Sequence, residues 1–262
     1  MQQRTQDWYR ARAGRITGSR FSRAMAAKHS DTYRRLIDEL AEERRTGSCK
    51  DGDFVNAAMQ WGIDHEDTAR RWYARERANQ VQQTGFVVHS ELNFVGVSPD
   101  GLVGDDGLVE IKCPQRNAFQ QVRKANAMPS RYRWQVQGQL WVCGRTWLDF
   151  VCFYPPQDGI IVRVECDRND FALLRARCIE VNRDVELRLK SLPSEITSQS
   201  SATRPKAKPH EPSLASNKNT ANNPPASIAP SQNLQDSSEK RGTAWFWVII
   251  ALIAMSTVSA MR

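Results

Sequence analysis

Apolar residues recur at helical spacing along several stretches of the first 192 residues of this 262-residue chain. Two predicted helices run from Asp31 to about Arg45 and from Asp53 to about residue 78, and each opening aspartate is a candidate N-cap. Three more helices are predicted over residues 115–125, 131–143 and 171–192. Helices are therefore expected at both ends of this part of the chain.

Runs rich in β-branched and aromatic residues lie between these helices and predict strands. They cover residues 85–89, 94–97, 147–154 and 160–166. The last run alternates two sets of side chains, as expected when successive residues point to opposite faces of a sheet. A chain that begins with helices and continues with a sheet interrupted by a helical pair is predicted to form an α/β or α+β sandwich. Its mixed central sheet would be flanked by helices.

One further stretch combines a hairpin pattern with charged groups. Two short apolar runs joined by an Asp-Asp-Gly turn span residues 102–109, and they bring Asp100 back toward Glu110 and Lys112. Glu110 and Lys112 share one face of the strand, whereas Ile111 points the other way, into the core. Two carboxylates that share a site bind a hard cation such as Mg²⁺, and an adjacent lysine orients or deprotonates a water. The stretch therefore predicts metal-assisted phosphodiester hydrolysis.

The composition adds a basic charge balance, with 37 lysines and arginines against 29 aspartates and glutamates, which suits a polyanionic partner. Six cysteines are present, but none forms a Cys-x-x-Cys pair. The grouping that an iron–sulfur cluster requires is missing, and buried free thiols in a reducing compartment are predicted instead. Residues 1–15 are polar and arginine-rich and lack the pattern of a secretory signal peptide.

Beyond residue 192 the composition changes twice. Residues 193–243 are rich in Ser, Pro, Asn, Lys, Ala and Gln without apolar periodicity, so a disordered linker is predicted there. Residues 244–261 carry no charge, and their number is near the lower limit of roughly 17 for a transmembrane helix. Trp245 and Trp247 suit a membrane interface, and the preceding Lys240-Arg241 favours a cytoplasmic N-terminal domain tethered by a C-terminal single-pass helix. A buried core helix is the alternative.

A Glu-x-Lys pair on a strand is by itself typical of a solvated ion pair, but three further motifs accompany it. They are WYRARAGRITGS at residues 8–19, WGIDHE at residues 61–66 and QVQGQLWV at residues 135–142. With the motif at residues 99–112, these blocks resemble, in the same order, the motifs of the lambda-exonuclease and YqaJ-type viral recombinase nucleases. The resemblance covers about residues 8 to 154. It implies a restriction-endonuclease-like PD-(D/E)xK core within a nuclease domain over residues 1–192.

The resemblance implies a role for each residue of the metal site. Asp100, Glu110 and the backbone carbonyl of Ile111 are the implied ligands of Mg²⁺, for which Mn²⁺ can substitute. Lys112 is implied to position the attacking water or to stabilise the charge that develops on the phosphate. Glu66 is implied as a direct or outer-sphere ligand, and the alternative is a solvated acid on an exposed helix face.

The same resemblance extends to substrate contacts. Gln135 is implied to contact a phosphate-bound water, and the alternative is an ordinary polar position on a helix. Arg12, Ser19 and Ser98 are implied to grip a terminal 5′-phosphate, which an arginine and two hydroxyls suit chemically. The alternative for Ser19 is a helix N-cap, and Arg15 and Arg20 are nearby alternatives for the arginine.

Taken together, these observations predict a Mg²⁺-dependent exonuclease. By resemblance, it would degrade linear double-stranded DNA from 5′ to 3′ in recombination or repair. The resemblance also implies a homo-oligomer, a trimer, and a single-strand annealing or recombinase protein as partner. Three rival interpretations are an endonuclease with the same core, a non-catalytic DNA-binding protein of the same fold, and a membrane-surface protein whose tail carries the main function. Cutting of circular DNA would distinguish the first of these.

Overall fold

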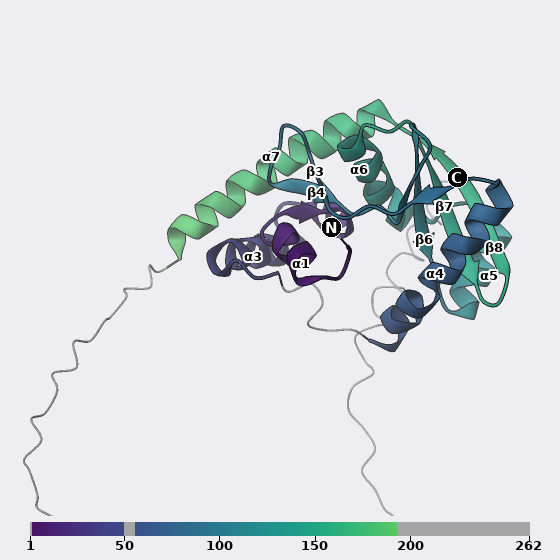
Figure 1. The fold of residues 1–262 in the computed structure, drawn as a ribbon. Helices are drawn as coiled ribbons and strands as arrows, with labels where there is room; N and C mark the ends of the chain where they lie inside the picture. Colours follow the sequence, from purple (N-terminus) through teal and green to yellow (C-terminus); the bar gives the residue numbers. More distant parts are fainter. Residues whose placement is uncertain (1, 50–55, 193–262) are drawn as a thin grey trace, which may run out of the picture. The chain divides into compact units, whose positions relative to one another are not determined.

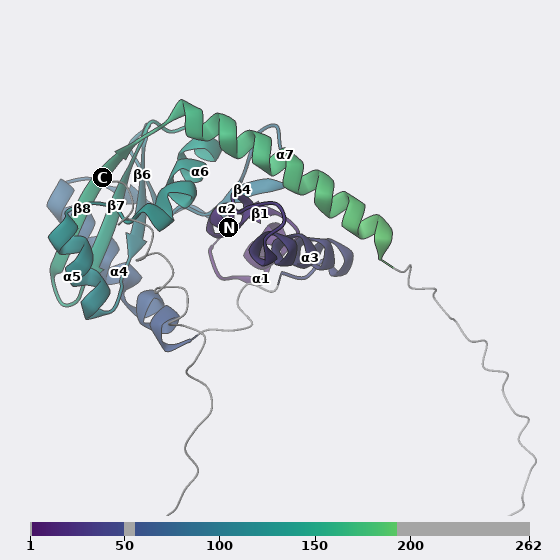
Figure 2. The same cartoon turned by 180° about the vertical axis from the view of Figure 1, so that it is seen from behind.

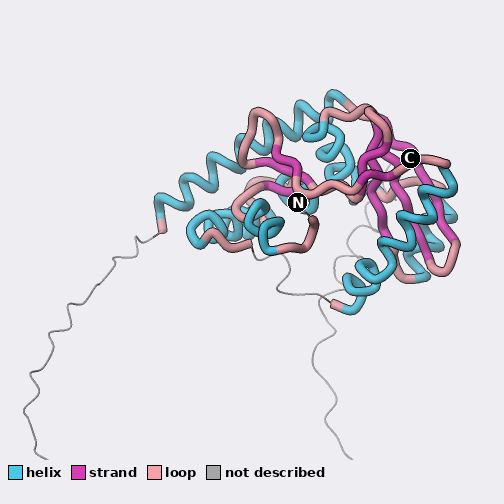
Figure 3. The backbone as a smooth tube through the Cα atoms, viewed as in Figure 1, coloured by secondary structure: helices cyan, strands magenta, loops and turns pink. Residues whose placement is uncertain are grey.

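The computed structural model describes residues 2–49 and 56–192. Its helices are α1 (Gln6–Arg12), α2 (Phe21–Ala24), α3 (Asp31–Thr46), α4 (Ala57–Arg77), α5 (Arg116–Ala125), α6 (Arg133–Cys143) and α7 (Arg168–Ser191). Its strands are β1 (Ile16–Thr17), β2 (Val81–Gln82), β3 (Val87–Val88), β4 (Val95–Val97), β5 (Gly101–Val103), β6 (Gly107–Lys112), β7 (Trp147–Tyr154) and β8 (Asp158–Glu165). Short 3-10 turns cover Gly18–Arg20 and Ser130–Tyr132. The strands form two separate groups (Figure 3).

The larger group is a five-stranded sheet in the order β2-β5-β6-β7-β8. The β5–β6 hairpin is antiparallel, β6 and β7 are parallel, and β7 and β8 are antiparallel, so the sheet is mixed. Gly104, at φ 54°, begins the turn of the hairpin in a left-handed conformation that glycine adopts easily. The predicted hairpin and the predicted mixed sheet flanked by helices are both confirmed.

Helices cover both faces of this larger sheet (Figures 1 and 2). On one face, Trp72 and Tyr73 of α4 pack against Val109, Ile111 and neighbouring strand residues. On the other face, α5 and α6 supply Phe119, Val122, Val136 and Leu140, which pack on Leu108, Leu148 and Phe150. Burial of these apolar faces against one another is the main stabilising contribution to this part of the fold. Ile111 is only 5% exposed, as the alternation of β6 predicts.

The smaller group is a three-stranded sheet in the order β1-β4-β3. The pairing of β1 with β4 is parallel, and it joins residues about eighty positions apart, Ile16 with Val95 and Thr17 with Gly96. Its core contains residues of α3 and α7, including Leu36, Leu40, Leu174 and Cys178. Both views show the long helix α7 passing from the larger sheet toward α3. The two sheets therefore have separate hydrophobic cores.

Helix α6 contacts both cores with different faces. Its Val136 and Leu140 belong to the core of the larger sheet. Its Trp134 and Trp141 pack against the core of the smaller sheet. Gly138, between these faces, leaves room for the ring of Phe21, because a Cβ there would come within 2.1 Å of it. The polar residues of α6 are therefore held between the two sheets.

The boundaries of the helices agree with the sequence patterns more closely than their caps do. Helix α3 is capped by Ser30, whose hydroxyl accepts from the Tyr33 N–H, so the predicted cap at Asp31 is wrong. Helix α4 is capped by Asn56 rather than by Asp53. The strands β1 and β2 are absent from the prediction, because two-residue strands show no alternation.

The predicted linker (193–243) and the predicted transmembrane segment (244–261) lie outside the described residues. Within the described part of the chain, no helix has both the length and the apolar character needed to span a bilayer.

Candidate active site

The hairpin of β5 and β6 places two carboxylates beside each other. The register pairs Gly101 with Val109, so one step further along the ladder Asp100 lies opposite Glu110. Oδ2 of Asp100 accepts a hydrogen bond of 2.7 Å from the backbone N–H of Ile111. This bond ties the end of β6 to the residue that precedes β5. The predicted proximity of Asp100 to Glu110 is therefore present in the structure.

Glu110 is buried, with 2% of its surface exposed, and it accepts from three side chains. Lys112 and Gln135 both donate to its Oε1, Gln135 at 2.5 Å, and Gln139 donates to Oε2 at 2.6 Å. The two glutamines lie one turn apart on α6 and so present their amides on the same face. Lys112, Gln135 and Glu110 thus meet where β6 packs against α6.

The neighbouring charges act on the pKa of Asp100 and on that of Lys112. Burial raises the pKa of Asp100 well above its ordinary value, and the negative charges of Glu110 and Glu66 raise it further. Lys112 and the Ile111 N–H act in the opposite direction. For Lys112, burial disfavours the ammonium, but the charges of Glu110 and Asp100 and the hydrogen bond to Glu110 outweigh it and raise the pKa. The site therefore gathers acids around a lysine that keeps its proton.

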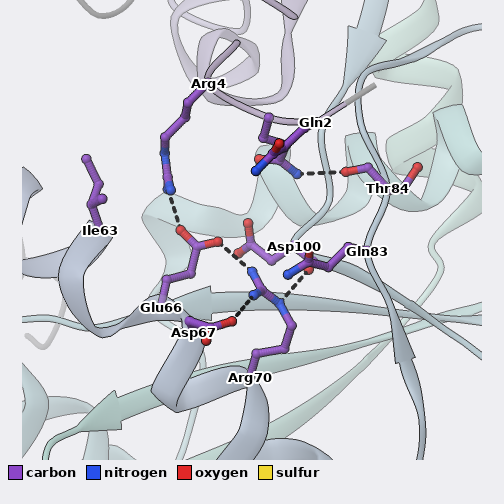
Figure 4. A pocket seen from close by; sticks show the side chains of 10 residues that line it. Gln2, Arg4, Ile63, Glu66, Asp67, Arg70, Gln83, Thr84 and Asp100 are labelled. Carbon is purple, nitrogen blue, oxygen red and sulfur yellow. Dashed lines mark hydrogen bonds and ion pairs between the residues drawn. The ribbon is translucent and has the colours of Figure 1, made fainter.

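Glu66 approaches from helix α4 and lines a pocket of about 520 Å³ that Asp100 also lines (Figure 4). It pairs with Arg70 at 2.7 Å and with Arg4. The guanidinium of Arg70 also donates to Asp67 at 3.0 Å and to the backbone carbonyl of Asp100 at 3.2 Å. Arg70 therefore joins the helix-borne acid to the start of β5.

The oxygen atoms at this site can be compared with the ligands that a divalent cation prefers. Among the described residues, no three side chains of His, Cys, Asp and Glu gather closely enough to hold a metal by themselves. Two carboxylates, Asp100 and Glu110, are adjacent. In a strand the N–H and C=O of one residue lie on the same edge, so the Ile111 carbonyl shares the edge that faces Asp100. Two carboxylates and a carbonyl are hard oxygen donors and fit Mg²⁺, which keeps several waters.

The residues predicted to grip a phosphate come from three segments. Arg12 ends α1, Ser19 lies in the 3-10 turn after β1, and Ser98 follows β4. Trp8 joins two of them: its indole N–H donates to Ser98 Oγ at 2.9 Å, and the guanidinium of Arg12 stacks 4.2 Å from its ring centroid. Ser19 is exposed and its hydroxyl lies 3.3 Å from that of Thr17.

The turn that carries Ser19 also lies close to α6. A Cβ at Gly18 would come within 3.6 Å of Val97 and 3.9 Å of the Gln135 side chain. Ser98 is two residues before Asp100 in the chain. Two of the predicted phosphate-binding residues, Ser19 and Ser98, are therefore near the predicted site residues Gln135 and Asp100.

The two alternative arginines have other partners. Arg20 is 3% exposed and forms two hydrogen bonds with Glu43, of 2.8 and 2.5 Å. Arg15 donates to the backbone carbonyls of Asn93 and Ala11, at 2.7 and 2.6 Å. Ser19 does not cap α2, whose N-cap position is Arg20. Of the three arginines, Arg12 is the one that stacks on Trp8, whose indole N–H donates to Ser98.

Several residues of this region are missing from the sequence prediction. Arg70 is four residues after Glu66, and the i,i+4 rule for acid–base pairs on a helix could have identified it. Gln139 shares a helix face with Gln135, which predicts proximity but not the contact with Glu110. Arg4 is 62 positions from Glu66, and no local pattern indicates that pair. The contact of Trp8 with Ser98 joins residues that are even further apart in the sequence, by 90 positions.

The chain is also similar to known proteins in sequence and in structure. Residues 7–146 match the model of the YqaJ-like viral recombinase domain. The alkaline exonuclease LHK-Exo from Laribacter hongkongensis is similar in structure, with a TM-score of 0.66, 32% identity, and coverage of 71% of this chain and 95% of that one. A structure of LHK-Exo in complex with dAMP gives a TM-score of 0.67 with the same identity and coverage.

A more distant likeness concerns the fold alone. The phage-related exonuclease from Haemophilus somnus 129PT is 14% identical, with a TM-score of 0.53 over 67% of this chain and 95% of that chain. No curated protein sequence matches the chain.

Proposed function

Since the chain belongs to the family of YqaJ-like viral recombinase domains, we propose that it is a metal-dependent exonuclease of double-stranded DNA. The similarity to an alkaline exonuclease over 95% of that protein's length supports nuclease activity. The observation that best supports metal-dependent hydrolysis is the position of Asp100 opposite Glu110, with Lys112 hydrogen-bonded to Glu110. A non-catalytic DNA-binding protein has no need for two adjacent acids facing a polyanion.

Each residue of the site has a proposed role. Asp100, Glu110 and the Ile111 carbonyl hold the cation, Mg²⁺ or Mn²⁺, which when bound polarises the phosphate and activates a water. Lys112 orients the attacking water with its ammonium and offsets negative charge that develops on the phosphate. Gln135 holds Oε1 of Glu110 without adding charge.

Glu66 has a more distant role in this proposal. Its oxygens are occupied by Arg70 and Arg4, and the described acids form no three-membered cluster. We therefore assign Glu66 to the outer sphere, where its charge still acts on Asp100.

The end of the DNA is held by a second set of residues. Arg12, Ser19 and Ser98 supply a guanidinium and two hydroxyls, which suit a phosphate dianion. Ser98 accepts from Trp8, so its own hydroxyl proton is available to donate to a phosphate. Because this set adjoins the acids, a terminal 5′-phosphate bound there would place a nearby phosphodiester at the acids. This proximity supports 5′ to 3′ removal of nucleotides.

The biological context of the proposal depends on the family. Family membership favours a role in recombination or repair, with a single-strand annealing or recombinase protein as partner. It also favours a homo-oligomer, a trimer by resemblance. The domain is proposed to extend over residues 1–192 and to have the PD-(D/E)xK core.

For the C-terminal tail, our proposal is based on the sequence alone. Residues 244–261 contain no charge, and they follow a segment of low apolar content. We propose that they anchor the protein to a membrane, with the nuclease on the cytoplasmic side. Cell fractionation of the full-length protein beside a version ending at residue 243 tests this. Equal abundance of both proteins in the soluble fraction would contradict it.

The central experiment uses the full-length protein on 5′-labelled linear duplex and on closed circular duplex, with Mg²⁺, Mn²⁺ or EDTA. Degradation of the linear DNA only, in the presence of the metal, is the expected result. Asp100→Asn should be inactive, whereas Asp105→Asn, in the exposed turn of the same hairpin, should be active. Cleavage of circular DNA would instead indicate an endonuclease. Full activity of Asp100→Asn, or full activity in EDTA, would contradict the proposed chemistry.

A further inference from the structure

The three donors to Glu110 are distributed unevenly between its two oxygens. Oε1 accepts from Lys112 and from Gln135, whereas Oε2 accepts from Gln139. An ionised carboxylate has about four acceptor positions, two on each oxygen. Donors from the described residues leave one of the four acceptor positions of Glu110 unoccupied, and this position lies on Oε2. The oxygen that Gln139 holds is therefore the oxygen with capacity to bind a further group.

The environment of Gln139 fixes the direction of its amide. The residue is 1% exposed, its Nε2 donates to Glu110, and its Oε1 has no hydrogen-bond partner among the described residues. Turning the amide over would place Oε1 against a carboxylate, which only accepts hydrogen bonds. A buried oxygen without a partner is unfavourable and is rare in folded proteins. The contact with Glu110 is thus retained at the expense of an unsatisfied carbonyl.

Gln137, on the same helix, shows what a structural glutamine looks like here. Its Nε2 donates to the Glu165 carbonyl at 2.9 Å, and its Oε1 accepts from the Asp167 N–H at 2.9 Å. Both ends of this amide are satisfied, and they join α6 to the connection between β8 and α7. Gln137 is also buried, at 5% exposure, so burial does not distinguish the two glutamines. Their partners do.

We propose that Gln139 is a positioning residue that directs Oε2 of Glu110 toward the bound divalent cation. This inference rests on the proposed function, because it assigns the free position on Oε2 to the metal. An uncharged amide suits the role, since it orients the carboxylate without neutralising the charge that attracts the cation. Partners of this kind, one step removed from the metal, commonly change metal affinity ten- to a hundredfold when they are removed.

The test compares Gln139→Leu and Gln139→Asn with the matched control Gln137→Leu, all in the full-length protein. Leucine preserves much of the volume without a donor, and asparagine keeps the amide on a shorter side chain. Mn²⁺ binding is measured directly by electron paramagnetic resonance of the free ion, and indirectly by the Mn²⁺-induced rise in melting temperature. The second measurement is referred to each variant's own melting temperature without metal, so a general loss of stability does not affect it.

We expect both Gln139 variants to bind Mn²⁺ about tenfold more weakly than the wild type, and Gln137→Leu to bind it normally. If Gln139→Leu does not fold, Gln139→Asn alone decides the question. Wild-type affinity in the Gln139 variants, or an equal loss in Gln137→Leu, would overturn the role of Gln139 while leaving the nuclease assignment intact. A wild-type protein that neither binds Mn²⁺ nor cleaves DNA would overturn the proposed function itself.

Discussion

The acids on the larger sheet and the proposed phosphate-binding residues beside the smaller sheet are assembled in different ways. Asp100, Glu110 and Lys112 lie within one hairpin, and their relative positions follow from its register. Arg12, Ser19 and Ser98 come together only because β1 pairs with β4 across about eighty residues and because Trp8 contacts both Arg12 and Ser98. The first site is defined by local structure, and the second depends on the tertiary fold.

This difference has energetic consequences. In the acidic site the buried carboxylate of Glu110 accepts from Gln135 and Gln139 as well as from Lys112, so substitution of Lys112 should remove chemistry without unfolding the domain. The second site shares its surroundings with a buried ion pair between Arg20 and Glu43, whose side chains are 4% and 0% exposed. Substitutions there can affect either binding or stability, and the structure separates the two cases.

The largest effect is expected on the larger sheet. Lys112→Met should lower the rate of cleavage roughly ten-thousandfold, about 5.5 kcal/mol of activation free energy. It removes the ammonium that is proposed to orient water, and it leaves Glu110 without its charged partner. Single-turnover kinetics on linear duplex measures the effect, with Lys124→Met on the exposed end of α5 as control. A wild-type rate in Lys112→Met, with an unchanged circular dichroism spectrum, would remove Lys112 from the site.

The next effect concerns stability beside the smaller sheet. Arg20→Met should lower the free energy of unfolding by about 3 to 5 kcal/mol, because it removes the guanidinium that pairs with the buried carboxylate of Glu43. Urea denaturation measures it, and Arg23→Met, which breaks a half-exposed pair with Glu39, is the control. A change below about 1 kcal/mol would mean that the Arg20 pair contributes no more than a surface ion pair.

A smaller and more selective effect is expected at the proposed phosphate-binding set, Arg12, Ser19 and Ser98. Arg12→Met should lower activity on 5′-phosphorylated ends by ten- to a hundredfold, about 1.4 to 2.7 kcal/mol, because it removes the proposed charged donor to the phosphate. Activity on 5′-hydroxyl ends should change much less. Arg10→Met, on the same helix but exposed and paired with Asp7, is the matched control. Equal losses on both kinds of end would show that Arg12 does not bind the terminal phosphate.

The features that could be predicted from local sequence patterns are those defined by local structure, and the features that depend on the tertiary fold were missed by such patterns. The hairpin, the strand from Trp147 to Tyr154 and the long helix containing Glu66 show periodic patterns, and the structure confirms them. The two-residue strands β1 and β2 show none, although β1 positions the turn that carries Ser19. The partners of Glu66 illustrate the limit: Arg70 obeys a spacing rule on one helix, whereas Arg4 reaches the same carboxylate from a distant segment.

Arg70 offers a test of the link between helix α4 and the hairpin. Arg70→Gln should raise the Mg²⁺ concentration required for half-maximal activity about fivefold, about 1 kcal/mol, because it releases Glu66 and the Asp100 carbonyl. Arg71→Gln is the matched control, since Arg71 pairs with Asp67 at 66% exposure and lies on the same helix. Identical metal dependence in the two variants would show that the position of Asp100 does not depend on Arg70.

The smallest effect is expected in an experiment on local opening, which compares the larger sheet with the region of the smaller sheet. Burial raises the pKa of the Cys152 thiol to about 12, and that of Cys178 to about 12, so neither forms appreciable thiolate near pH 8 while it remains buried. Their alkylation therefore reports opening of the surrounding structure. Cys152 lies on β7, which has a neighbouring strand on each side, whereas Cys178 lies on α7 against a sheet whose strands have two or three residues.

We therefore expect Cys178 to react about threefold faster than Cys152, a difference of ~0.7 kcal/mol in opening free energy. Peptide mapping by mass spectrometry after timed alkylation of the wild-type protein measures both rates, and alkylation in denaturant corrects for intrinsic reactivity. The half-buried Cys166 provides a reference for a thiol that needs no large opening. Equal rates for Cys152 and Cys178 would mean that the two sheets open together as one cooperative unit. The longer strands of the larger sheet would then give it no additional protection against opening. The two regions would differ in how their sites are assembled but not in their local stability.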